Sequence, residues 1–131
     1  MEPQGELTEA QLEVMEAVWA VGEKGATVAE IWEAIATKRQ VARTTVLTMV
    51  TRLEERGWLT RSAMGRAHRY LAQKPRQQAV AQLARRFVQA FFSGSPSALL
   101  KSLLGEEHIS PEELERLKKL VRESGKSPPA R

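Results

Sequence analysis

The chain contains no cysteine and only two histidines among its 131 residues. The absence of cysteine excludes disulfide bonds, thiolate metal sites and thiol catalysis. Two histidines without metal-ligand spacing do not predict a transition-metal site. No apolar run approaches the roughly 18–20 residues of a membrane-spanning helix, and the start, MEPQGELTEAQ, lacks the features of a secretory signal. We therefore expect a cytoplasmic protein with no membrane partner.

Motifs for catalysis are also lacking. The acidic residues are all glutamates, and most fall on faces that should be solvated. The chain has neither a glycine-rich phosphate loop nor the strand–turn–helix motif that carries a nucleophilic serine. We expect no catalytic residue, no metal and no cofactor, and we do not expect an enzyme.

Charge is distributed unevenly along the chain. Residues 1–37 contain eight glutamates against one lysine, whereas residues 38–74 contain nine lysines and arginines against two glutamates. A basic segment of this kind suits a polyanionic partner. Charge blocks also occur in proteins that bind no nucleic acid, so the segment must be judged by the elements that it contains.

Three short sequences, LTEAQL, ATVAEI and ISPEEL, have the layout of a capping box at the start of a helix. The first two begin helices predicted over about 9–21 and 28–37. A third helix is predicted from about residue 42 to Gly57, a residue suited to a left-handed C-terminal cap. In the first helix, the spacing places Leu12, Met15, Val18 and Trp19 inward.

The apolar period changes after the third helix. WLTRS and AHRYLA alternate in polarity on either side of the turn sequence AMGR, which predicts a β-hairpin. Three helices followed by a basic hairpin describe a winged helix-turn-helix. The predicted fold is therefore mainly α, with a two-stranded β-hairpin as the wing.

The third predicted helix, within RTTVLTMVTRLEERG, contains four threonines although threonine disfavours helices. At about 100° per residue, Val46, Met49, Val50 and Leu53 form an apolar stripe and most of the threonines fall opposite. Threonine offers a hydroxyl to phosphate or base and a methyl to thymine without filling the major groove. The alternative is a solvated face that merely tolerates threonine. The predicted DNA-binding residues are Arg43, Thr44, Thr45, Thr48, Arg52, Arg61, Arg66 and Arg69.

Pro75 marks the expected end of the winged helix. Apolar spacing predicts helices over about 76–92, from Pro96 onward, and over about 111–123. Their apolar faces could pack back onto the first domain, but three such helices after a complete winged helix favour a partner chain. We predict domains at 1–74 (winged helix) and 75–124 (dimerisation), and a disordered tail at 125–131. The predicted dimer interface comprises Val80, Leu83, Phe87, Phe91, Leu99, Leu103, Leu117 and Val121.

Taken together, LTEAQLEVMEAVW, TVAEIWEAI, TTVLTMVTRLEERGWL, GRAHRY and FFSGSPSALLKSLL resemble the penicillinase-repressor family, the β-lactamase and methicillin-resistance repressors of bacteria. The resemblance covers about residues 7–121. It implies a homodimeric winged-helix repressor that dimerises through its C-terminal helices and binds palindromic double-stranded DNA, often of TACA/TGTA type. The family's recognition-helix and wing patterns match Thr44, Thr45, Thr48, Arg52, Leu53, Gly57, Gly65, Arg66 and Tyr70.

The chain departs from the family in the residues that respond to a signal. Drug-resistance members are inactivated by proteolysis at an Asn-Phe bond, which implies a regulatory protease as a partner. The matching place here is Ser102-Leu103. Copper-responsive members carry a C-terminal cysteine cluster, which this chain lacks. The inducing signal, the operator and the regulated genes therefore stay open.

A sequence-specific, dimeric DNA-binding repressor is the predicted function. The competing class is a winged-helix module that binds protein through the same helices and hairpin, without sequence-specific DNA binding. The predominantly positive segment favours DNA, because protein interfaces tend to be depleted of lysine.

Overall fold

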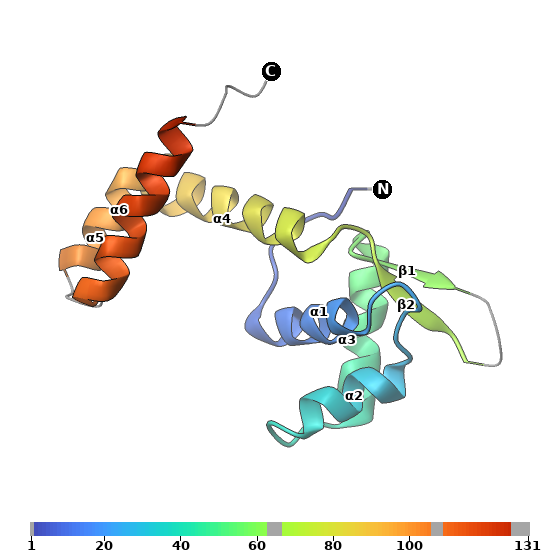
Figure 1. Cartoon of the computed structure of the whole chain (residues 1–131). Helices are drawn as coiled ribbons and strands as arrows, with labels where there is room; N and C mark the ends of the chain where they lie inside the picture. Colours follow the sequence, from blue (N-terminus) through green and yellow to red (C-terminus); the bar gives the residue numbers. More distant parts are fainter. Residues whose placement is uncertain (1, 63–66, 106–108, 127–131) are drawn as a thin grey trace. The chain divides into compact units, whose positions relative to one another are not determined.

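The computed structural model describes residues 2–62, 67–105 and 109–126, and the chain divides into two compact units, residues 1–83 and 84–131 (Figure 1). The fold is mainly helical with one antiparallel hairpin, as predicted. Along the described ranges the elements are α1 (Glu9–Val21), α2 (Val28–Ala36), α3 (Arg43–Glu55), β1 (Leu59–Ser62), β2 (Arg69–Ala72), α4 (Arg76–Phe92), α5 (Pro96–Gly105) and α6 (Pro111–Lys126).

The predicted helix starts are confirmed by their caps. At α1, the Gln11 N–H donates to Thr8 Oγ1 (3.1 Å) and the Thr8 N–H donates to Gln11 Oε1 (3.0 Å). The same reciprocal pair joins Thr27 and Glu30 at α2. At α6, the Ser110 hydroxyl accepts the N–H of the third helical residue at 3.1 Å. Each bond satisfies a backbone group that the first helical turn leaves without a partner.

The end of α3 is also formed as predicted. Gly57 has a φ of 83°, in the left-handed region. The Trp58 N–H donates to the Leu53 carbonyl (2.9 Å) and the Gly57 N–H donates to the Glu54 carbonyl (3.1 Å). This pair of bonds is a Schellman motif, which turns the chain directly from α3 into β1.

One hydrophobic core holds α1, α2, α3 and the hairpin together. Its fully buried members include Met15, Ile31, Val46 and Leu53. Val14 is also fully buried, although the sequence pattern did not place it inward, while Leu12 is only half-buried.

The reason for this difference is that α1 packs against α2, α3 and β2 together. A helix with neighbours on several sides buries a wider face than one apolar stripe. The first half of α4 belongs to the same unit, where Ala79 is buried and Leu83 packs against the core.

The hairpin pairs Leu59 with Ala72 and Ser62 with Arg69 at its two described ends. A further backbone pair joins it to the segment before α2, where Ala26 and Tyr70 exchange hydrogen bonds of 3.0 and 2.8 Å. The base of the wing is thereby fixed to the helix-turn-helix. The predicted turn, including Gly65 and Arg66, lies outside the described residues.

The second unit contains the end of α4 together with α5 and α6. The Phe87 and Phe91 rings lie 4.9 Å apart on α4. Leu100 of α5 and Leu117 of α6 line a shallow apolar groove with Val121. Helix α6 continues to Lys126, past its predicted end near residue 123; residues 127–131 of the predicted tail lie outside the described residues. In the ranges that the structure describes, no helix is long and apolar enough to span a bilayer.

Candidate nucleic-acid interface

Helices α2 and α3 are joined by the turn at residues 37–42 and form a helix-turn-helix (Figure 1). Val46, Val50 and Leu53 anchor α3 in the core, each with no exposed surface. The opposite face is open to solvent along the whole helix. Its exposed residues are Arg43, Thr44, Thr45, Leu47, Thr48, Thr51, Arg52 and Glu55. All predicted DNA-binding residues of α3 therefore lie on its exposed surface.

Thr48 shows how a threonine on the exposed face of α3 can fit the helix and still contact DNA bases. Its hydroxyl donates to the Thr44 carbonyl at 3.0 Å, a bond within the helix that satisfies the hydroxyl hydrogen. The oxygen lone pairs and the methyl group remain exposed. In this rotamer Thr48 can accept a hydrogen bond from adenine N6 or cytosine N4, or contact a thymine methyl.

Two arginines of α3 make no ion pair in the part of the chain that the structure describes. Arg52, near the C-terminal end, is fully available to an external partner. Arg43, the first residue of α3, lies over the Trp32 ring, with 5.5 Å between the guanidinium carbon and the ring centre. The Trp32 Nε1–H donates to the Val41 carbonyl at 2.8 Å. Both cations are thus exposed without a neutralising carboxylate.

The two described arginines of the wing are engaged within the protein. Arg61 pairs with Glu54 at 3.4 Å. Arg69 donates to the Gly25 carbonyl at 3.0 Å and lies 3.4 Å from a Glu30 carboxylate oxygen. These contacts brace the wing against α3 and α2. Each uses a single guanidinium nitrogen, so the other N–H donors of these partly exposed side chains stay available to DNA.

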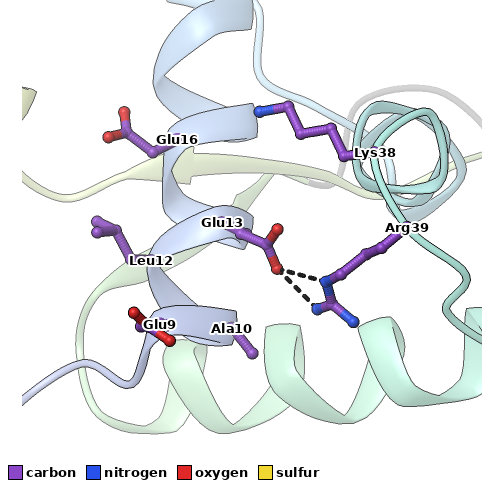
Figure 2. A pocket seen from close by; sticks show the side chains of 7 residues that line it. All are labelled: Glu9, Ala10, Leu12, Glu13, Glu16, Lys38 and Arg39. Carbon is purple, nitrogen blue, oxygen red and sulfur yellow. Dashed lines mark hydrogen bonds and ion pairs between the residues drawn. The ribbon is translucent and has the colours of Figure 1, made fainter.

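Acidic residues of the N-terminal segment neutralise other lysines and arginines of the basic segment. Glu13 accepts two hydrogen bonds from Arg39 (3.0 and 2.7 Å), and Figure 2 shows this pair bridging α1 and the turn after α2 across a shallow pocket. The Arg39 guanidinium holds the pKa of the Glu13 carboxyl below its usual value. Glu2 pairs likewise with Lys74 at 2.6 Å. The basic block seen in the sequence is therefore smaller in the folded protein. Among the described residues, Arg43 and Arg52 of α3 and Lys38 of the preceding turn are cations of the block that have no ion pair and no hydrogen bond from the charged group.

Arg56 also serves the fold rather than the surface. Its guanidinium donates to the Gln4 carbonyl (3.0 Å), the Glu6 carbonyl and Gln11 Oε1 (3.4 Å). The Trp58 Nε1–H donates to the same Gln4 carbonyl at 2.9 Å. These bonds fasten the segment before α1 across the end of α3.

Arg52 and Arg56 both lie at the C-terminal end of α3, but we expect them to have different roles. Substituting Arg56 should lower stability, whereas substituting Arg52 should leave stability nearly unchanged and affect DNA binding. Arg56→Ala is expected to lower the free energy of unfolding by about 2 kcal/mol, because several charge-assisted hydrogen bonds are lost. Arg52→Ala, the matched control, should change it by less than about 0.5 kcal/mol. Urea titration, monitored by tryptophan fluorescence, measures the free energy of unfolding of both variants. A larger loss of stability for Arg52→Ala than for Arg56→Ala would contradict this assignment.

Two residues of this surface were not predicted from the sequence. Trp32 was not assigned a role, because its contact with Arg43 joins two helices and leaves no periodic signal. Leu47 is 47% exposed among the threonines of α3. Its position on the flank of the apolar stripe was the available signal, since a large apolar side chain there is not required by the core.

An exposed second helix rich in threonine and arginine, next to a β-hairpin, is the arrangement of a winged helix-turn-helix domain that binds nucleic acid. The chain matches the family model described as penicillinase repressor over residues 7–123. It belongs to this family.

Curated relatives and solved structures are similar to the chain over most of their length. It is 33% identical to the transcriptional regulator BlaI of Mycobacterium tuberculosis over 122 residues, covering 89% of this chain and 86% of the relative. It is 24% identical to the methicillin resistance regulatory protein MecI of Mammaliicoccus sciuri over 116 residues, covering 88% and 93%. The solution structure of monomeric Bacillus licheniformis BlaI with the blaP half-operator has a TM-score of 0.49 at 23% identity, covering 59% and 92%.

Proposed function

We propose that the chain is a sequence-specific DNA-binding transcriptional repressor that acts as a homodimer on a palindromic operator. The observation that carries this proposal is the surface of α3, where threonines and two arginines without an ion pair are exposed while Val46, Val50 and Leu53 of the same helix are fully buried. Membership of the penicillinase-repressor family supports it, since the relatives include a transcriptional regulator and a resistance regulatory protein.

The proposed roles differ along the surface. Thr44, Thr45, Thr48 and Arg52 face outward at positions from which a helix in the major groove reaches base edges. The remaining arginines are assigned to the phosphate backbone, where long cationic side chains position a protein without reading sequence. These backbone-contacting residues are Arg43, Arg61, Arg66 and Arg69.

The helical segment 75–124 is proposed as the dimerisation domain. Phe87, Phe91, Leu103 and Val121 support this role, because large apolar side chains with 41–69% exposure are costly to leave in water. Leu83 contributes less than expected, since it packs against the core of the first unit. The remaining members of the proposed interface, Val80, Leu99 and Leu117, are half-buried.

Two further parts of the proposal concern regulation and location. A repressor acts where the DNA is, so the proposed location is the cytoplasm. A regulatory protease is a partner in this proposal on the family resemblance alone, and the signal that relieves repression stays open. Since α5 carries Ser102-Leu103 at the relevant place, such a protease would need to cleave before leucine.

The dependence of DNA affinity on salt tests the proposal. Titration of fluorescent duplex DNA at several salt concentrations is expected to give a slope of log K against log salt of about −0.9 for each phosphate neutralised. Because several lysines and arginines of the basic segment form ion pairs within the protein, the slope should be shallower than a count of all nine suggests. A flat response would exclude DNA and favour a protein-binding module.

A further inference from the structure

Trp32 makes two contacts with the beginning of α3. Its indole N–H donates to the Val41 carbonyl at 2.8 Å, in the turn before the helix. Its ring lies under Arg43, whose guanidinium carbon is 5.5 Å from the ring centre. The indole packs against the hydrophobic core, so a ring held in place by the core lies against an exposed cation.

We propose that Trp32 is a positioning residue for DNA binding, which holds the Arg43 guanidinium ready to bind a phosphate of the DNA backbone. This inference rests on the proposed function. Trp32 belongs to α2 rather than to α3, and it acts on DNA only through Arg43.

The chemistry of arginine allows both interactions at once. A guanidinium presents its flat face to an aromatic ring, while its N–H donors lie in the plane and point outward from its edge. Phosphate oxygens accept two of these donors in parallel. The contact with the Trp32 ring uses none of the N–H donors of Arg43, which therefore remain free to bind phosphate. It also restricts the side chain before binding, which reduces the conformational entropy lost when the complex forms.

The charges around Arg43 favour the same role. In the described part of the chain, Arg43 has no carboxylate partner, whereas Arg39, Arg61 and Arg69 each have one. Binding a phosphate therefore costs Arg43 no existing ion pair. The side chain also stands at the N-terminal end of α3, where the helix dipole favours an anion.

A double-mutant cycle tests the inference. Affinity for the operator and for random duplex is measured for wild type, Trp32→Leu, Arg43→Ala and the double variant. We expect Trp32→Leu to lower DNA affinity about 3-fold and Arg43→Ala to lower it about 10-fold. The double variant should bind as Arg43→Ala does, with no further loss of affinity. The losses should be similar on both duplexes. In Arg43→Ala, the salt slope should become shallower by about 0.9 for each Arg43 in the complex.

Conservative variants and a matched control exclude a merely structural role. Trp32→Phe keeps an aromatic face and should retain most of the affinity. Trp19→Leu removes a comparable indole, which donates to the Lys74 carbonyl at 2.9 Å and, among the described residues, has no arginine in cation–π contact with its ring. It should change melting temperature without changing DNA affinity.

Three outcomes would overturn the inference. Multiplicative losses in the double variant would show that Trp32 does not act through Arg43. An affinity loss for Trp19→Leu as large as that for Trp32→Leu would show a general effect of stability. Wild-type protein that binds no duplex would refute the proposed function itself, and this inference with it.

Discussion

Val121→Glu is expected to convert the protein from a dimer to a monomer and to weaken its binding to the palindromic operator by roughly 100-fold or more. In the isolated chain Val121 is 68% exposed, so a glutamate there remains hydrated and the fold of the monomer is retained. In a dimer built on the apolar faces of α4 and α6, the same carboxylate would be buried without a partner, at a cost of several kcal/mol, on the order of 100-fold or more in affinity.

The operator affinity should fall with dimerisation because the two reading helices are coupled through it. A single winged helix occupies one half-site, and the second half-site, about one helical turn away, adds affinity only when both protomers are joined. Affinity for a single half-site should therefore be nearly unchanged. Sedimentation velocity measures the mass, and titration of palindrome and half-site duplexes measures the binding.

Lys119→Glu is the matched control, since it places a carboxylate on the exposed polar side of α6. It should remain dimeric at micromolar concentration. A wild-type protein that sediments as a monomer and still binds the palindrome tightly would show that the C-terminal helices do not form the functional dimer.

Arg52→Ala is expected to lose sequence specificity. If Arg52 bridges a guanine through O6 and N7, its removal should weaken operator binding by roughly 10- to 100-fold, the equivalent of about 1–3 kcal/mol per base contact. Binding to random duplex should fall only slightly. Thr48→Val, which keeps the shape but removes the hydroxyl, should cause a smaller loss of the same kind.

Competition between operator and random duplex measures this specificity. Arg85→Ala removes the same side chain from an exposed position of α4 and should leave the ratio of the two affinities unchanged. Equal losses on both duplexes for Arg52→Ala and Thr48→Val would show that α3 positions the protein without reading bases.

Local signals account for most of the fold that the sequence predicts. The capping boxes at Thr8 and Thr27 and the glycine at the end of α3 act within a few residues, so they can be read directly from the chain. The exposed face of α3 followed from the spacing of its buried residues. Val14 was missed because its burial depends on the several elements around α1.

The site was harder to predict where it depends on long-range pairing. Arg69 looked like a free cation of the wing, yet it contacts Gly25 and Glu30. The aromatic ring under Arg43 belongs to Trp32 of another helix, α2. The carboxylate that neutralises Arg39 belongs to Glu13 of α1. Charge counts along a sequence cannot show which charges meet after folding.

Selection of bound sequences from a pool of random duplex DNA, with the purified full-length protein, tests sequence-specific repression most directly. A dimer that reads DNA through α3 should enrich a two-fold symmetric sequence, with half-sites about one helical turn apart. Arg52→Ala should lose preference at defined positions within each half-site. A pool that shows no enriched sequence after repeated rounds, while the protein remains folded, would contradict sequence-specific recognition.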